Sequence, residues 1–147
     1  MNSCGLARVA AALALAALGA CSAPPATRLS AEDACRALVD SLNSAVPPGQ
    51  SLAELQARGI RVRTPLRLPP GALPASDQPG GAAVQGMISL DGRVVPGSPK
   101  AIRSMGEAQI AAAIEAGALS MSFEFDVGAK PVAPIPFTTT YSLCIRS

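Results

Sequence analysis

Two segments near the C-terminal end alternate in polarity with a period of two residues, and this pattern restricts the fold more than any other feature of the chain. Residues 121–127 place apolar side chains on one face and polar side chains on the other. Residues 137–145 repeat the pattern, and one face carries Phe137, Thr139, Tyr141, Leu143 and Ile145. A period of two is typical of half-buried β-strands. Because the three Phe and the single Tyr all lie in these segments, we expect the two strands to pair antiparallel and stack their rings in the core.

Two helices are predicted in the first half of the chain from a serine followed three residues later by an acidic residue, the pattern of an N-terminal cap. The first begins after Ser30, and its apolar stripe includes Cys35. The second begins after Ser51 and is short, because Gly59 can end it in the left-handed conformation. Residues 60–63 then alternate and predict a short strand.

The last third of the chain predicts a hairpin followed by a helix. Residues 84–90 are strand-like, Asp91-Gly92 has the composition of a tight turn, and residues 93–95 return antiparallel. A capping box at residues 104–107 predicts a helix with one apolar face of Ile110, Ala113, Ile114 and Gly117. Residues 65–81 are dense in Pro and Gly, so we expect an irregular connection there.

These elements predict a single α+β domain over residues 30–147, with a small antiparallel sheet covered by one or two helices. Cys144 lies on the face of its strand opposite the aromatic side chains, so that face must be covered as well. The helix that carries Cys35 is the expected cover.

The first twenty residues are predicted to be a targeting segment and not part of the domain. Arg8 is their only charge, and Val9 to Ala20 form a twelve-residue apolar run. A helix that spans a hydrocarbon core of about 30 Å needs about 20 apolar residues, so this run is too short and suits the central region of an export signal. The alternative is a buried helix rich in Ala and Leu, which the basic residue in front and the prolines behind disfavour.

The end of this segment, Leu18-Gly19-Ala20-Cys21, resembles the lipobox of bacterial lipoproteins. The resemblance implies a signal peptide at 1–20 and a lipidated tether at 21–29, with a diacylglyceryl thioether on Cys21 and fatty acyl chains such as palmitate. Several chains give stable membrane anchorage, which one chain does not. Ser22 at the following position implies the outer membrane, facing the periplasm. The alternative is an ordinary export signal with a chance cysteine.

Four cysteines remain to be assigned, and the lipoprotein resemblance separates them. Cys4 leaves with the signal and Cys21 carries lipid, so Cys35 and Cys144 are left in a compartment where disulfides form and persist. We predict that these two pair. The alternatives are two buried free thiols or a redox pair, and neither cysteine lies in a C-x-x-C motif.

Composition excludes several classes of function. The absence of His removes Ser-His and Cys-His nucleophile pairs and the commonest metal ligand. A formal net charge of +2, with 15% charged residues and 3% aromatic residues, is too small for the phosphate contacts and base stacking of nucleic-acid binding. We therefore expect no catalytic residue, no cofactor, no metal ion and no nucleic-acid partner.

Two charged groups are weaker candidates for sites. The basic cluster is interpreted either as the solvated face of an edge strand or as a site for anionic lipid or glycan, and consists of Arg58, Arg61, Arg63 and Arg67. Glu124 and Asp126 stand two residues apart on one strand face, where two carboxylates can act as acid and base or bind a cation. Two carboxylates without further ligands are more often a solvated face.

The order strand, Asp-Gly turn, strand, helix, strand, strand over residues 84–145 resembles the TonB C-terminal domain. The matching segments are Leu90–Val94, Arg103–Gly106, Ala111–Ile114, Phe123, Gly128–Val132 and Pro136–Leu143. The resemblance implies a TonB-like fold and a protein-binding role. TonB transducers, however, have an uncleaved transmembrane helix and a long Pro-rich spacer, and neither is predicted here. Ser120, Met121 and Ser122 replace the family's basic and Trp residues, and Phe125 replaces its Pro, which argues against energy transduction.

The predicted function is that of a non-catalytic outer-membrane lipoprotein whose domain binds a periplasmic or outer-membrane protein by β-augmentation. The candidate edge strand is 137–145, with Phe137, Thr139 and Tyr141 as candidate partner-binding residues; the alternative is an ordinary internal strand. The alternatives in function are a structural envelope lipoprotein, a subunit of an envelope assembly, or an accessory protein of TonB-type energy transduction.

Overall fold

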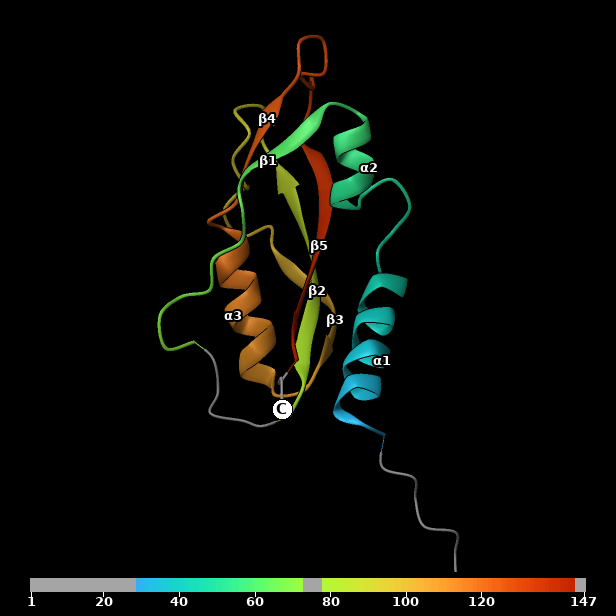
Figure 1. Cartoon of the computed structure of the whole chain (residues 1–147). Coiled ribbons are helices and arrows are strands. Elements are labelled where there is room, and N and C mark those ends of the chain that lie inside the picture. Colours follow the sequence, from blue (N-terminus) through green and yellow to red (C-terminus); the bar gives the residue numbers. More distant parts are fainter. Residues whose placement is uncertain (1–28, 73–77, 145–147) are drawn as a thin grey trace, which may run out of the picture.

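A computed structural model describes residues 29–72 and 78–144, and these residues form an α+β fold of three helices and two antiparallel sheets (Figure 1). The helices are α1 (Ala31–Ser44), α2 (Leu52–Ala57) and α3 (Ala108–Ala118). The strands are β1 (Ile60–Thr64), β2 (Gly80–Ile88), β3 (Lys100–Met105), β4 (Ser122–Phe125) and β5 (Ile135–Leu143). One sheet has the order β3-β2-β5, and the other pairs β1 with β4. The predicted α+β class is confirmed.

β2 is the central strand of the larger sheet, and five of its nine residues are Gly or Ala. It pairs with β5 in a continuous register from Gly80–Leu143 to Ile88–Ile135. A Cβ atom at Gly81 would lie 2.9 Å from Leu42 of α1, and one at Gly86 would lie 2.7 Å from the Phe137 ring. Small residues in β2 therefore let a helix and an aromatic ring approach the sheet closely.

Helices α1 and α3 cover opposite faces of this sheet. On one face, Leu38 and Leu42 of α1 pack on Ala83. On the other face, Ile110 and Ile114 of α3 pack on β2 in a second cluster that also contains Ala82, Val84 and Ala118. The predicted apolar face of α3 is confirmed, since all four of its predicted residues are buried.

A third apolar cluster joins the two sheets beneath α2. Its buried members are Leu55, Ile60, Ile88, Val94, Met121, Phe123, Ile135 and Phe137. The Phe123 and Phe137 rings meet here with centroids 5.2 Å apart and planes tilted by 58°. The aromatic contact thus forms between the two sheets.

The predicted pairing of 121–127 with 137–145 is wrong. β4 pairs with β1, and β5 pairs with β2. The reason is length, because β2 and β5 are both nine residues long and match throughout, whereas β4 has four residues. The alternation of β4 also ends early: the Asp126 N–H donates to the Gly59 carbonyl, and Val127 is fully exposed.

Two of the three predicted N-terminal helix caps are confirmed. Ser30 caps α1 through the Asp33 N–H, and Ser51 with Glu54 forms a complete capping box on α2. The predicted box at 104–107 is wrong, because Ser104 and Met105 belong to β3, a strand that the sequence pattern did not indicate. The cap of α3 is Glu107, whose side chain makes no capping bond.

A disulfide joins Cys35 in α1 to Cys144, directly after β5, with a Cα–Cα distance of 5.5 Å. Cys144 packs against the cluster of Leu38, Leu42 and Ala83, so α1 is the cover that the alternation of β5 required. The predicted pairing and the predicted attachment of the helix to the final strand are both confirmed.

Replacing both cysteines (Cys35→Ser with Cys144→Ser) should lower the free energy of unfolding by roughly 4 to 5 kcal/mol, because the bridge closes a long loop and limits the unfolded chain. The two cysteines are 109 residues apart in the sequence. Urea unfolding of the oxidised protein, the reduced protein and the double variant measures the effect. Equal midpoints for all three would contradict it.

Candidate functional site

β5, the candidate partner-binding strand, lies at an edge of the three-stranded sheet. Phe137 and Thr139 are buried, and Tyr141 is half-buried against the α3 face of the sheet. Their side chains belong to the core and offer little contact area to a partner. Any pairing at this edge must therefore use the backbone of β5.

The backbone groups that face away from β2 belong to the alternate residues of β5. The Thr138 N–H donates to the Gln50 carbonyl at 2.8 Å, so the N–H of Thr138 points outward and that part of the edge is occupied. Because orientation alternates along a strand, the backbone groups of Thr140 and Ser142 point outward as well. These two residues form the open section of the β5 edge, and no described segment pairs with it.

The two edges of this sheet differ in how they resist strand addition. β3 carries an irregularity in its register with β2 between Ala83 and Val84, and its sequence includes Lys100 and Arg103. Bulges and charged side chains are the usual means of blocking an edge. The open section of β5 has a continuous register and uncharged Thr and Ser side chains. β5 is therefore the better acceptor for an added strand.

The predicted basic cluster does not form one site. Arg61 makes ion pairs with both Glu124, at 3.7 Å, and Asp126. Arg58 donates to the Gly49 carbonyl at 3.4 Å. The backbone N–H of Arg67 donates to Ser120. Arg63 is exposed on β1.

The same ion pairs account for the two carboxylates that were candidates for acid-base or cation chemistry. Glu124 faces Arg61 directly across the β1–β4 pair, and Asp126 lies against the same guanidinium. Within residues 29–72 and 78–144, no group of three or more His, Cys, Asp or Glu side chains is placed to hold a metal ion. The interpretation as a solvated, ion-paired strand face fits this arrangement.

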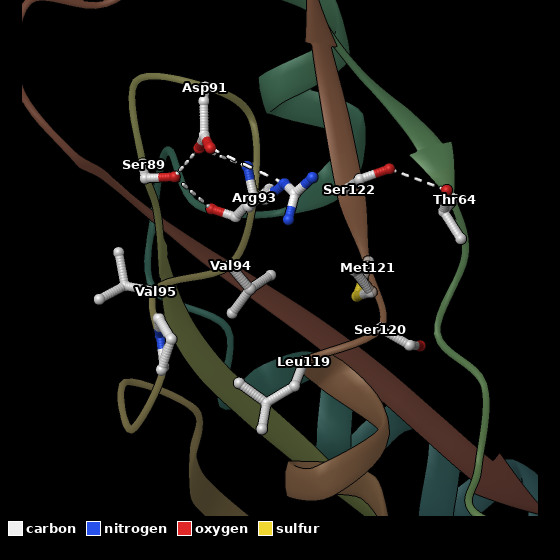
Figure 2. A pocket seen from close by; sticks show the side chains of 11 residues that line it. Thr64, Ser89, Asp91, Arg93, Val94, Val95, Leu119, Ser120, Met121 and Ser122 are labelled. Atoms are coloured by element: carbon white, nitrogen blue, oxygen red, sulfur yellow. Dashed lines mark hydrogen bonds and ion pairs between the residues drawn. The ribbon is translucent and has the colours of Figure 1, made fainter.

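A cleft of about 670 Å³ opens beside the turn that follows β2 (Figure 2). One wall is the hairpin from Ser89 to Pro96, and the other is the segment from Leu119 to Ser122, which leads from the end of α3 into β4. The lining residues are Thr64, Ser89, Asp91, Arg93, Val94, Val95, Pro96, Leu119, Ser120, Met121 and Ser122. We call it the Arg93 cleft.

The turn in the hairpin wall is fixed by hydrogen bonds and by contact with β4. The Ser89 N–H donates to the Arg93 carbonyl at 2.8 Å, as the predicted Asp-Gly hairpin requires. Gly92 has a φ of 81°, and its carbonyl accepts from the Phe123 N–H at 2.7 Å. A side chain at Gly92 would collide with the Phe123 backbone. The turn is thereby held against the first residues of β4.

Asp91 is the only acidic residue that lines the cleft in the described chain. Hydrogen bonds from the Ser89 hydroxyl and the Arg93 N–H hold the pKa of Asp91 below its ordinary value, and the Arg93 charge adds to this effect. The Arg93 Nε atom lies 3.8 Å from the carboxylate. Asp91 is therefore ionised at neutral pH.

The cleft was not predictable from the sequence, although Asp91 and Gly92 were identified as a turn. Leu119 to Ser122 are separated from the turn by β3 and α3, and only the tertiary fold brings the two walls together. No short motif in the sequence marks residues 119–122 as the second wall.

Cys21, the predicted lipid attachment site, lies outside the described residues, as does Ile145. In the described part of the chain, none of the helices combines the length and the apolar character needed to cross a bilayer. Comparisons with protein-family models, curated proteins and solved structures gave no match to this chain.

Asp91→Asn should destabilise the protein at neutral pH, and the difference from wild type should shrink in acid. A pKa that is lower in the folded state stabilises the fold above the ordinary value of 3.8 and loses this contribution as the pH falls through the folded-state pKa. Thermal unfolding of both proteins across this range measures the difference. Glu32→Gln, on the exposed surface of α1, is the matched control. A difference between wild type and Asp91→Asn that does not change with pH would contradict the role given to Asp91.

Proposed function

We propose that this chain is a non-catalytic lipoprotein of the outer membrane, anchored at Cys21 on the periplasmic side, whose TonB-like domain binds an extended segment of an envelope protein. The open section of the β5 edge, at Thr140 and Ser142, is the observation that carries the proposal. An exposed strand edge offers main-chain hydrogen bonds to any extended chain, and its affinity comes from those bonds.

The Cys35–Cys144 disulfide supports the location of the protein, because structural disulfides persist in oxidising compartments such as the periplasm. It also leaves Cys21 as the cysteine available for lipidation at the lipobox-like motif. The tether of residues 22–29 reaches at most about 28 Å when fully extended. The domain is therefore held near the membrane surface.

The disulfide also supports an inference about where the proposed binding edge lies relative to the proposed anchor. Cys144 lies two residues beyond Ser142, and its partner Cys35 lies near the start of α1. The open edge is thus at the tethered end of the domain. A partner strand at this site comes from a protein segment close to the inner surface of the outer membrane.

Replacing Cys21 by Ser should release the protein from the membrane fraction into the soluble periplasmic fraction, because the acyl chains provide the anchorage. Fractionation and mass spectrometry of the mature N-terminus measure the change. Cys4→Ser is the control and should leave lipidation unchanged. Wild-type protein with an unmodified residue 21 would contradict the proposed anchor.

Two substitutions at Thr140 test the binding edge. Thr140→Pro removes the outward N–H, whereas Thr140→Ala keeps it, and both remove the hydroxyl that contacts Asn43. With a photo-crosslinker at Ser142 in intact cells, we expect a discrete crosslinked partner for wild type and Thr140→Ala. We expect its loss for Thr140→Pro.

Thermal unfolding of both variants shows whether the domain remains folded. If wild type gives no crosslink, or if the folded proline and alanine variants crosslink equally, main-chain pairing at this edge is wrong. A crosslink to many unrelated proteins in every variant would favour a structural envelope role.

A further inference from the structure

The Arg93 cleft has the size and lining of a small-ligand site, and its chemistry differs between its floor and its mouth. Ligand sites commonly enclose about 300 to 1,000 Å³ and combine apolar walls with a few polar groups that fix orientation. The cleft of about 670 Å³ falls in this range. Figure 2 shows Val94, Leu119 and Met121 gathered around its lower part and Arg93 above them.

The floor is apolar and belongs to the core. Val94 and Met121 are 5% and 3% exposed, and both are part of the cluster that joins the two sheets. Leu119 extends this surface to the rim, where its side chain is 48% exposed. An aliphatic group of a ligand placed here would bury apolar surface against a rigid floor.

Most hydroxyl groups of the lining are already engaged within the protein. The Ser89 hydroxyl donates to Asp91 and contacts the Arg93 carbonyl. The Ser120 hydroxyl donates to the Gly117 carbonyl at 2.7 Å and accepts from the Arg67 N–H. The Ser122 hydroxyl donates to Thr64 Oγ1 at 2.8 Å. A hydroxyl carries a single proton, so these three have no donor left for a ligand.

Two side-chain groups therefore remain as donors to a ligand. Thr64 Oγ1 accepts from Ser122, and no acceptor for its own proton is found among the described residues. The Arg93 side chain is 83% exposed, and only its Nε atom is near a carboxylate, at 3.8 Å from Asp91 Oδ2. Its terminal nitrogens present a pair of parallel N–H donors, the geometry that binds a carboxylate in bidentate fashion.

We propose that the Arg93 cleft binds a carboxylate attached to an aliphatic body, with the carboxylate on Arg93 and Thr64 and the aliphatic group over Val94, Met121 and Leu119. The ligand class follows from the donors that remain: the site has a cation and a hydroxyl proton at its mouth and apolar side chains below. This site is separate from the β5 edge and does not depend on the proposed function.

Asp91 lowers the affinity for a carboxylate ligand, so a substitution there should change binding in the opposite direction to a substitution of Arg93. Its negative charge lies beside Arg93 and repels an incoming carboxylate. Removing that charge while keeping the acceptor oxygen, as Asp91→Asn does, should strengthen binding. A merely structural role for the turn predicts the reverse, because the variant weakens the turn.

The first experiment compares two probes that differ only in charge. Isothermal titration and backbone amide shifts of the full chain are measured with N-acetyl-leucine and with N-acetyl-leucinamide. We expect the acid to bind and to shift the amides of Arg93 and Ser122, and the amide to bind about tenfold more weakly or not at all. A peptide that ends in leucine, free or amidated, then distinguishes a small acid from the end of a protein chain.

The second experiment uses three variants of the full chain with N-acetyl-leucine. Arg93→Gln should weaken binding about tenfold, and Asp91→Asn should strengthen it several-fold. Arg103→Gln is the matched control and should bind as wild type, because Arg103 contacts Ser41 of α1 on another face. The amide spectrum of each variant shows that it is folded.

Three results would overturn the proposal. These are equal binding of the acid and the amide, no binding of either probe or of the free peptide to the wild type, and equal losses for Arg93→Gln and Arg103→Gln. Weaker binding by a folded Asp91→Asn variant would also contradict the assigned geometry.

Discussion

The packing on both faces of β2 is the constraint on which the rest of the structure depends. A sheet of three strands has a small core, and here that core is divided between two helices that contact opposite faces of one strand. Glycine and alanine in β2 reduce the separation between helix and sheet, so that Leu38 and Leu42 of α1 and the apolar face of α3 are buried. The positions of both edges, and of the turn after Ile88, follow from this central strand.

Local signals in the sequence predicted those parts of the fold that are decided by neighbouring residues. Ser30 and Ser51 begin helices because each serine oxygen accepts a hydrogen bond from the backbone N–H three residues later in the chain. This bond requires nothing from the tertiary structure. The Asp91-Gly92 turn was predictable for the same reason. The box at Ser104 failed because residues 103–105 pair with β2 in the sheet, and this pairing outweighs one capping bond.

Strand partners and the cleft were not predictable, because they depend on residues far apart in the chain. Alternation showed that β4 and β5 are strands, yet it contains no information about which strand lies beside which. The cysteine pair was an exception, because the interpretation as an exported lipoprotein left only Cys35 and Cys144 as candidates for a disulfide. The Arg93 cleft forms only because the end of α3 lies beside the hairpin turn in the folded chain, and no short sequence motif predicts that contact.

The bond between α1 and the end of β5 has a mechanical consequence under the attachment that we propose at Cys21. Tension applied to the tether enters the domain at Leu29 and reaches Cys35 within the first turns of α1. From there the load passes through sulfur into β5 and along nine paired residues into β2. The helix cannot be peeled from the sheet by such a pull, because the covalent crosslink transfers the force to the strand ladder before Leu38 and Leu42 are strained.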